Sequence, residues 1–182
     1  MSELPIIDLK NTNYNKVIST SGTNYEKNHP VNKCVTELDL LDSVIGISFK
    51  YLGDYKKIHK SLVKIQSRLI YLRCELLTHP RDWDEFCKKS KCINQKDIDY
   101  IDKCCNSISK SIKDIEDLGG NYGSSGESSA FFDYIECVCK KFEIALHDLD
   151  DNIHSTKISH YISEFINKLG QYLYLIARYL RD

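Results

Sequence analysis

A long helical spacing of apolar residues, with few interruptions, constrains the fold of this chain more than any other feature. From residue 55 to residue 79 the apolar side chains recur at alternating steps of four and three: Ile58, Leu62, Ile65, Leu69, Leu72 and Leu76. Residues at this spacing lie along one face of an α-helix, whereas a half-buried β-strand would alternate with a period of two. The segment therefore predicts a helix that buries one face against its neighbours.

Similar stripes occur in four further segments, at about residues 36–50, 95–118, 130–149 and 155–180. Thr36, ahead of Asp39, is a capping arrangement that predicts the start of the first helix. His79-Pro80 predicts the end of the second, because a residue before proline avoids the helical region. The sequence thus predicts an all-α fold, a five-helix up-and-down bundle.

The first 35 residues differ from the rest of the chain. They are polar and rich in asparagine, serine and threonine, which is typical of a loop or a weakly ordered arm. We therefore divide the chain into a polar N-terminal arm at residues 1–35 and a helical bundle domain at residues 36–182. Within the domain, residues 80 to about 94 are predicted to form a charged connection between helices.

The composition argues against several classes of function. The net charge is −1 over 182 residues, so we expect no basic face and no binding to nucleic acid. No run of about 18 uncharged apolar residues is present, so we expect no membrane span. The first eight residues carry acid where a signal peptide would be basic, and we therefore expect a cytoplasmic location.

Eight cysteines are spread along the chain. The group closest to metal-ligand spacing is Cys87-x4-Cys92, which precedes a pair of adjacent cysteines. His147 and His154, which flank an acidic turn, are a second alternative. Neither group has the ligand spacing of common zinc sites, and no CxxC pair is present. We therefore expect reduced structural thiols and no metal site.

Three short motifs lie on the predicted helices. They are Asp39-Leu40-Leu41-Asp42-Ser43-Val44-Ile45-Gly46 in the first helix, Cys139-Lys140-Lys141-Phe142-Glu143 in the fourth, and Phe165-Ile166-Asn167-Lys168-Leu169-Gly170-Gln171-Tyr172-Leu173 in the fifth. In this order and spacing they resemble the helical ATP:cob(I)alamin adenosyltransferases. The resemblance covers about residues 20–180, which is nearly the whole chain.

This resemblance implies an enzyme that moves the adenosyl group of ATP to the cobalt of cob(I)alamin, giving adenosylcobalamin and triphosphate. The implied ligands are ATP with Mg²⁺ and cobalamin, and the implied assembly is a homotrimer with its pocket between two subunits. Aromatic and aliphatic residues beside the main stripe of the fifth helix are predicted to contribute to that interface: Tyr161, Ile166, Tyr172 and Tyr179. Because a triphosphate leaves, the reaction needs in-line positioning and fixed positive charge.

The fourth helix departs from the family pattern, which reads Arg-x-x-x-Arg-Arg-x-Glu-Arg. Its four charged positions here are Glu136, Lys140, Lys141 and Glu143. The resemblance implies that Lys140, Lys141 and Glu143 form the catalytic set. However, lysine lacks the planar fork with which arginine binds phosphate, and Glu136 reverses the charge of the leading position. A solvated helix face is the alternative reading of Lys140 and Lys141.

Other predicted ligand contacts also rest on the resemblance. Lys27, Asn167 and Lys168 are the implied ATP-binding residues, and Tyr122 is the implied corrinoid-binding residue in place of a family phenylalanine. The glycine-rich segment with which the family wraps the phosphates has no counterpart in residues 11–15, and only Gly22 of residues 19–23 resembles it. Glycine matters there because side chains prevent the backbone from approaching phosphate closely.

The sequence therefore predicts an adenosyltransferase whose activity is weakened or lost. A non-catalytic protein that binds a corrinoid or a nucleotide is the main alternative, and a structural helical bundle that binds neither ligand is a further one. An unrelated helical scaffold with an accidental likeness is the third.

Overall fold

The structure, a computed structural model, describes residues 16–18, 24–112, 126–152 and 160–181. These parts contain six α-helices: α1 (Pro30–Ser48), α2 (Lys56–Leu76), α3 (Trp83–Lys89), α4 (Gln95–Ser109), α5 (Glu127–Asn152) and α6 (His160–Tyr179). Two 3₁₀ turns, η2 (Phe49–Tyr51) and η3 (Pro80–Asp82), follow α1 and precede α3. A short antiparallel pair, β1 (Lys16–Ile18) and β2 (Asn24–Glu26), precedes the helices.

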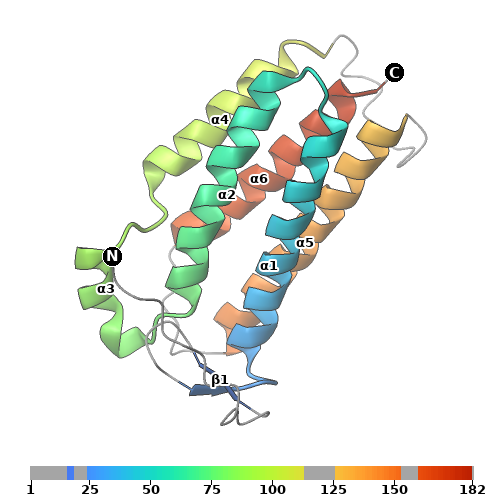
Figure 1. Cartoon of the computed structure of the whole chain (residues 1–182). Coiled ribbons are helices and arrows are strands. Elements are labelled where there is room, and N and C mark those ends of the chain that lie inside the picture. Colours follow the sequence, from blue (N-terminus) through green and yellow to red (C-terminus); the bar gives the residue numbers. More distant parts are fainter. Residues whose placement is uncertain (1–15, 19–23, 113–125, 153–159, 182) are drawn as a thin grey trace, which may run out of the picture.

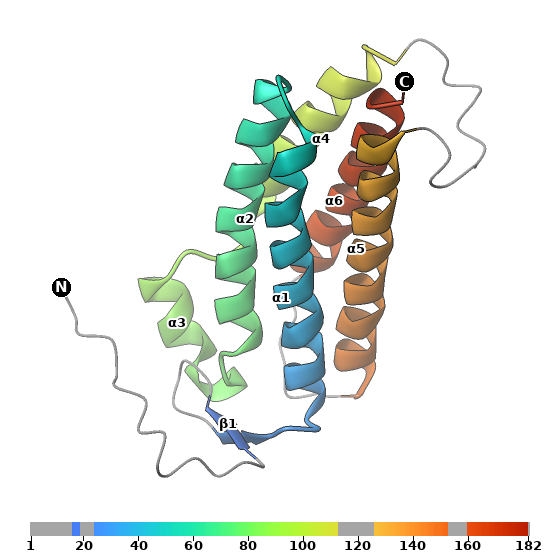
Figure 2. The same cartoon turned by 45° about the vertical axis from the view of Figure 1, so that its right-hand side comes forward.

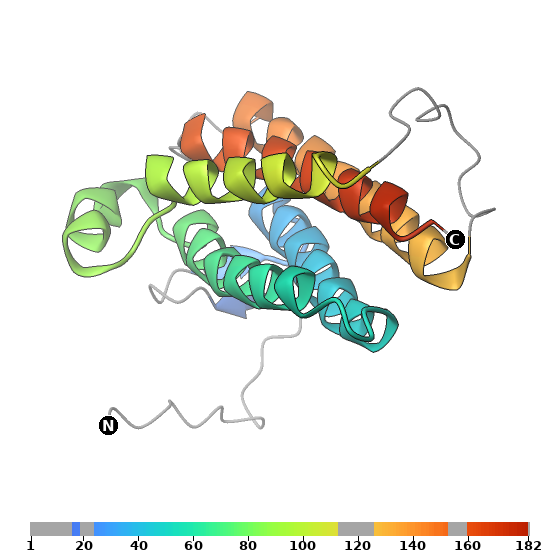
Figure 3. The same cartoon turned by 90° about the horizontal axis from the view of Figure 1, so that it is seen from above.

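Five of the helices lie side by side as a bundle (Figures 1 and 2). α1 packs against both α2 and α5, and α6 packs against both α5 and α4. Seen from above, α1 and α2 lie on one side of the molecule, while α4 and α6 lie on the other (Figure 3). The predicted all-α bundle is therefore confirmed, and its five stripes correspond to α1, α2, α4, α5 and α6.

The predicted number of helices and their first boundary were wrong. α3 lies in the segment predicted as a connection, and the stripe rule missed it because it has no buried side chain. α1 begins at Pro30 instead of residue 36, so the end of the predicted arm at residues 1–35 is helical. Proline suits the first helical position, and the His29 ring accepts a hydrogen bond from the Val31 N–H. Thr36 instead donates to the Asn32 carbonyl oxygen within α1.

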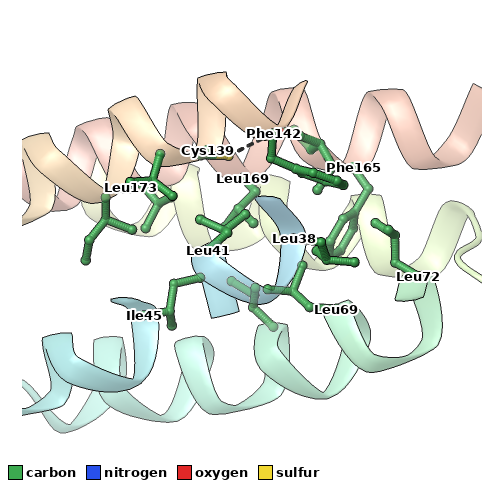
Figure 4. Close-up of a cluster of buried hydrophobic side chains, with 14 of the residues drawn as sticks. Leu38, Leu41, Ile45, Leu69, Leu72, Cys139, Phe142, Phe165, Leu169 and Leu173 are labelled. Atoms are coloured by element: carbon green, nitrogen blue, oxygen red, sulfur yellow. Dashed lines mark hydrogen bonds between the residues drawn. The ribbon is translucent and has the colours of Figure 1, made fainter. Parts of the chain in front are cut away.

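One continuous apolar core holds the bundle together. The predicted stripe of α2 is buried along its full length, at Ile58, Leu62, Ile65, Leu69, Leu72 and Leu76. Figure 4 shows where this stripe meets side chains from three other helices: Leu38, Leu41 and Ile45 of α1, Cys139 and Phe142 of α5, and Phe165, Leu169 and Leu173 of α6. Each fully buried side chain of this size contributes about 1.5–3 kcal/mol, so the core is the main source of stability.

Of the four α6 residues predicted to contribute to a subunit interface, Tyr161 and Tyr179 are partly exposed and the other two are buried. On α6, Ile166 and Tyr172 are buried within the subunit, and the Tyr172 hydroxyl lies 2.6 Å from Ser61 Oγ. Four exposed aliphatic side chains instead lie on α1 and α2: Leu40, Ile47, Val63 and Ile70. They are the largest aliphatic exposures on these two helices, and they mark a surface that could meet another protein.

A buried carboxylate fastens the segment between α3 and α4 to α2. Glu75 is 1% exposed, and its Oε1 accepts a hydrogen bond of 2.6 Å from the N–H of buried Ile93. Burial raises the pKa of Glu75 to about 7; the Ile93 N–H opposes this rise and the charge of Asp97 adds to it. The start of α4 is held nearby by the ion pair of Arg68 with Asp97, at 2.6 Å.

This geometry predicts that ionisation of Glu75 makes the stability of the protein depend on pH, and that replacement of Glu75 removes this dependence. A carboxyl group with a raised pKa in the folded state binds more protons when folded, so it destabilises the protein increasingly as the pH rises from about 4.5 to 7. Glu75→Gln should therefore be more stable than the wild type at pH 8, by about 1–3 kcal/mol, and should lose this advantage near pH 5. Urea denaturation at the two pH values measures the difference. Glu164→Gln, at an exposed position of α6, is the control, and an advantage independent of pH would contradict the assignment.

Candidate functional site

A groove between α5 and α6, of about 390 Å³, brings together several of the predicted site residues. Its lining consists of Glu136, Lys140 and Glu143 from α5 and Asn167, Gly170, Gln171, Tyr174 and Leu175 from α6. Of the seven residues predicted from sequence, Lys140, Glu143 and Asn167 thus share one site. The groove lies where the fourth-helix and fifth-helix motifs face each other, since α5 and α6 pack along much of their length.

The charge of Lys140 is paired within its own helix. Its Nζ lies 2.6 Å from Oε1 of Glu136, one turn earlier in α5. The Glu136 side chain is only 5% exposed, while that of Lys140 is 56% exposed. Lys140 is the only lysine or arginine among the described residues that line the groove. An anionic ligand would therefore meet a lysine whose charge is already balanced by a nearly buried carboxylate.

The opposite rim of the groove carries a chain of hydrogen bonds between polar side chains. Gln171 Nε2 donates to Asn167 Oδ1 at 3.0 Å, and Asn167 Nδ2 donates to Glu143 Oε1 at 3.4 Å. Asn167 and Gln171 are solvent-exposed, and Glu143 is partly exposed. This rim can donate and accept hydrogen bonds with a neutral polar group, but its only formal charge is the negative charge of Glu143.

The other two predicted lysines of these motifs are turned away from the groove. Lys141 Nζ pairs with Glu37 of α1 at 2.9 Å. Lys168 Nζ pairs with Asp102 of α4, also at 2.9 Å, and the hydrogen bond to Asp102 raises the pKa of the lysine. Neither residue lines the groove. Both lysines connect helices within the bundle, so the prediction that they act in the site is not supported by their positions.

The remaining predicted site residues lie apart from the groove or outside the described structure. Lys27 is exposed in the turn between β2 and α1 and does not line the groove. Tyr122 lies outside the described residues, as do residues 11–15 and 19–23, where the phosphate-wrapping segment was sought. Among the described residues, no three His, Cys, Asp or Glu side chains are grouped so that they could hold a metal ion. His154 falls outside this part of the chain.

The apolar part of the groove lining was not predicted. It consists of Gly170, Tyr174 and Leu175, and the guanidinium carbon of Arg178 lies 4.8 Å from the centre of the Tyr174 ring. Arg178 is buried and pairs with buried Asp133 of α5. The helical spacing of Asn167, Gly170 and Tyr174 could have shown that they share a face of α6.

Comparison with known proteins decides the family. A family model described as cobalamin adenosyltransferase matches residues 15–180. The chain belongs to the cobalamin adenosyltransferase family. The resemblance recognised in the motifs is therefore confirmed over nearly the whole chain. No curated protein sequence matches it.

Solved structures agree with the fold of this cobalamin adenosyltransferase family member. Two are phenylalanine variants of a PduO-type ATP:corrinoid adenosyltransferase from Lactobacillus reuteri complexed with cobalamin and ATP, each with a TM-score of 0.79 and 19% identity. The match to the first covers 94% of this chain and 91% of the variant's chain. The match to the second covers 95% of this chain and 89% of the variant's chain. A third, an arginine-to-lysine variant of the enzyme complexed with ATP, has a TM-score of 0.78 and 18% identity, covering 94% and 91%.

Within the described ranges, no helix is both long enough and apolar enough to span a lipid bilayer.

Proposed function

We propose that this protein binds a corrinoid and MgATP at the groove between α5 and α6, and that it transfers the adenosyl group far more slowly than family members with the arginine set. Membership of the family and the assembled groove support the ligands. The observation that carries the reduced activity is the ion pair between Lys140 and Glu136.

The reaction explains why this ion pair matters. Cob(I)alamin attacks the 5′ carbon of ATP, and the triphosphate leaves with its bonding electrons, so the departing oxygen gains negative charge. Fixed positive charge accelerates this step if it stabilises the transition state more than it stabilises bound ATP. Lys140 meets Glu136 instead, and a lysine also lacks the bidentate geometry of arginine. Each lost charge-assisted contact costs about 1.5–3 kcal/mol.

Variants of the Lactobacillus reuteri enzyme support the proposal that ligands can bind to a fold with such substitutions. Its two phenylalanine variants are complexed with cobalamin and ATP, and its arginine-to-lysine variant is complexed with ATP. In that protein, replacement of one phenylalanine is compatible with bound cobalamin and ATP, and exchange of one arginine for lysine is compatible with bound ATP. This chain has lysine at positions 140 and 141, where the family pattern has arginine, so the same kind of exchange is compatible with ATP binding here.

A non-catalytic binding or structural protein is the second candidate, and the nearly buried carboxylate of Glu136 favours it. If Glu136 excludes the triphosphate altogether, the groove could hold a corrinoid or a neutral nucleoside group without any transfer. The turnover assay below distinguishes the two candidates, because only the first predicts a measurable rate that rises when Glu136 is neutralised.

The catalytic proposal predicts slow turnover that a single substitution increases. With chemically reduced cob(I)alamin and MgATP, formation of adenosylcobalamin should proceed at less than about 10⁻² per second, a hundredfold below an ordinary turnover of about one per second. Glu136→Gln removes the negative charge beside Lys140 and should raise kcat/KM about tenfold to a hundredfold, since the lysine then stabilises the departing triphosphate more strongly. Glu136→Arg should act in the same direction.

Absorbance of the corrinoid follows the reaction directly, and Glu164→Gln on α6 is the matched control that should leave the rate unchanged. Wild-type turnover near one per second would overturn the proposal of weakened activity. A rate of zero in all variants would favour the non-catalytic candidate.

The homotrimer implied by the family is part of the same proposal, and the aliphatic face of α1 and α2 supports it. Arg73 pairs with Asp39 at 2.9 Å, and Gln66 donates to the Asp42 carbonyl oxygen at 3.0 Å, so the two helices run antiparallel. This register brings the exposed aliphatic residues to matching heights: Leu40 with Ile70, and Ile47 with Val63. Exposed aliphatic side chains grouped on two adjacent helices are typical of subunit contacts.

Substitution on this face should dissociate the assembly without unfolding the subunit. The wild type should scatter light as a trimer at micromolar concentration. The double variant Ile47→Glu and Val63→Glu should be a monomer with unchanged helical circular dichroism, because both positions are exposed within the subunit. Ile144→Glu, at an exposed position of α5, tests whether that helix also contributes. A monomeric wild type would contradict the proposed assembly.

All eight cysteines are free thiols in the structure. Free thiols are typical of proteins in a reducing compartment, which supports the cytoplasmic location that we propose for this protein.

A further inference from the structure

Two cysteines face each other at the C-terminal end of α3, away from the α5–α6 groove. Cys87 belongs to α3 and Cys92 to the segment that leads into α4, and their sulfur atoms lie 3.7 Å apart. A disulfide bond would need these atoms to approach by about 1.7 Å, which a short exposed segment can accommodate. We propose that Cys87 and Cys92 are a redox-modification site that forms a reversible intramolecular disulfide.

The two thiols differ in access, and this sets the order of their reactions. Cys87 is exposed, whereas Cys92 is partly buried. Burial and the nearby carboxylate of Glu75 raise the pKa of Cys92, which keeps it protonated and makes it the poorer first nucleophile. Cys87 is therefore the thiol that meets an oxidant from solution.

The charge of the surrounding segment favours an anionic oxidant. Lys88, Lys89 and Lys91 lie in sequence between or beside the two thiols and are exposed, and Lys89 is paired with Glu85. A small disulfide with carboxylates, such as glutathione disulfide, would be drawn to such a basic surface. This class of oxidant is also the one that a reducing compartment contains.

The chemistry balances with one such disulfide. The Cys87 thiolate attacks one sulfur of the oxidant, and its S–S bond breaks as the first small thiolate leaves and takes up a proton. Cys92 then loses its proton and attacks the Cys87 sulfur of the mixed disulfide, which expels the second small thiol. The protein loses two protons and two electrons, and the oxidant takes them up and becomes two thiols.

The bond would fix a helix that is otherwise weakly held. α3 is short and has no buried side chain, and Figure 2 shows it projecting beside the lower end of α2. Cys92, in contrast, directly precedes Ile93, which is buried and hydrogen-bonded to Glu75. A disulfide from Cys87 to Cys92 would therefore tie the last turn of α3 to an anchored point of the bundle.

Oxidation of the full chain with glutathione disulfide, followed by mass spectrometry, tests the proposal. Peptide mapping without reduction should find Cys87 linked to Cys92, with a mass lower by about 2 Da and no glutathione on either residue. Dithiothreitol should restore both thiols. Hydrogen exchange of α3 should slow about tenfold or more in the oxidised protein, while exchange of α2 should not change.

Two variants and one internal control make the result decisive. Cys92→Ser should trap glutathione on Cys87, whereas Cys87→Ser should react little. Cys137, the other exposed cysteine, should form only a mixed disulfide in the wild type, because its sulfur contacts the Glu136 carboxylate, whereas the sulfur atoms of Cys87 and Cys92 contact each other. Separate glutathione adducts on Cys87 and Cys92, or a cross-link of either one to a different cysteine, would overturn the proposal.

Discussion

The packing of α5 on α6 is the constraint on which the rest of this structure depends. Phe142 from α5 and Phe165 and Leu169 from α6 are fully buried in one seam, and α1 and α2 close over it (Figure 4). Near one end of the seam the buried ion pair of Asp133 with Arg178 joins the same two helices. Removal of one partner of such a pair leaves a buried charge uncompensated, so the pair fixes the register of the helices as well as their contact. The groove exists because this register places its lining residues on α5 and α6 beside each other.

Surface charge can change on this scaffold without changing the fold. The groove has an apolar lining from α6, while the lysines of the two motifs are paired with carboxylates of the chain itself. Lys140 balances Glu136, Lys141 connects α5 to α1, and Lys168 connects α6 to α4. Exposed ion pairs of this kind add little to stability, about 0–1 kcal/mol each. Their main effect is on the potential that an anionic ligand meets, and this effect underlies the proposed loss of rate.

Periodicity predicted the fold well, because burial of a long stripe is a local property of sequence. The five long helices follow from stripes that span several turns, as in α2 from Ile58 to Leu76. The same rule missed α3, whose contacts are confined to partly exposed groups such as Trp83 and Phe86, with ring centres 5.9 Å apart. It also placed the start of α1 too late, because the cap formed by His29 depends on a side chain outside the stripe.

The candidate site could be predicted only in part, for a different reason. Motif spacing identified Lys140, Glu143 and Asn167 because they face each other wherever these two helices pack in the family register. It could not show that Lys141 and Lys168 are directed elsewhere, since the partner of a long flexible side chain is chosen by the rotation of neighbouring helices. Acidic residues on α1 and α4, distant in sequence, decide the position of both lysines.

The central claim is that the groove gives little stabilisation to the phosphates of ATP, because its lysine is already paired. Calorimetric titration of the wild-type protein with MgATP and, separately, with adenosine measures this contribution directly as a difference between two affinities. The account predicts that MgATP binds no more than about tenfold more tightly than adenosine, which corresponds to about 1.4 kcal/mol or less. A preference for MgATP of about a thousandfold or more, equivalent to about 4 kcal/mol, would contradict it, because only several free cationic contacts could supply that energy.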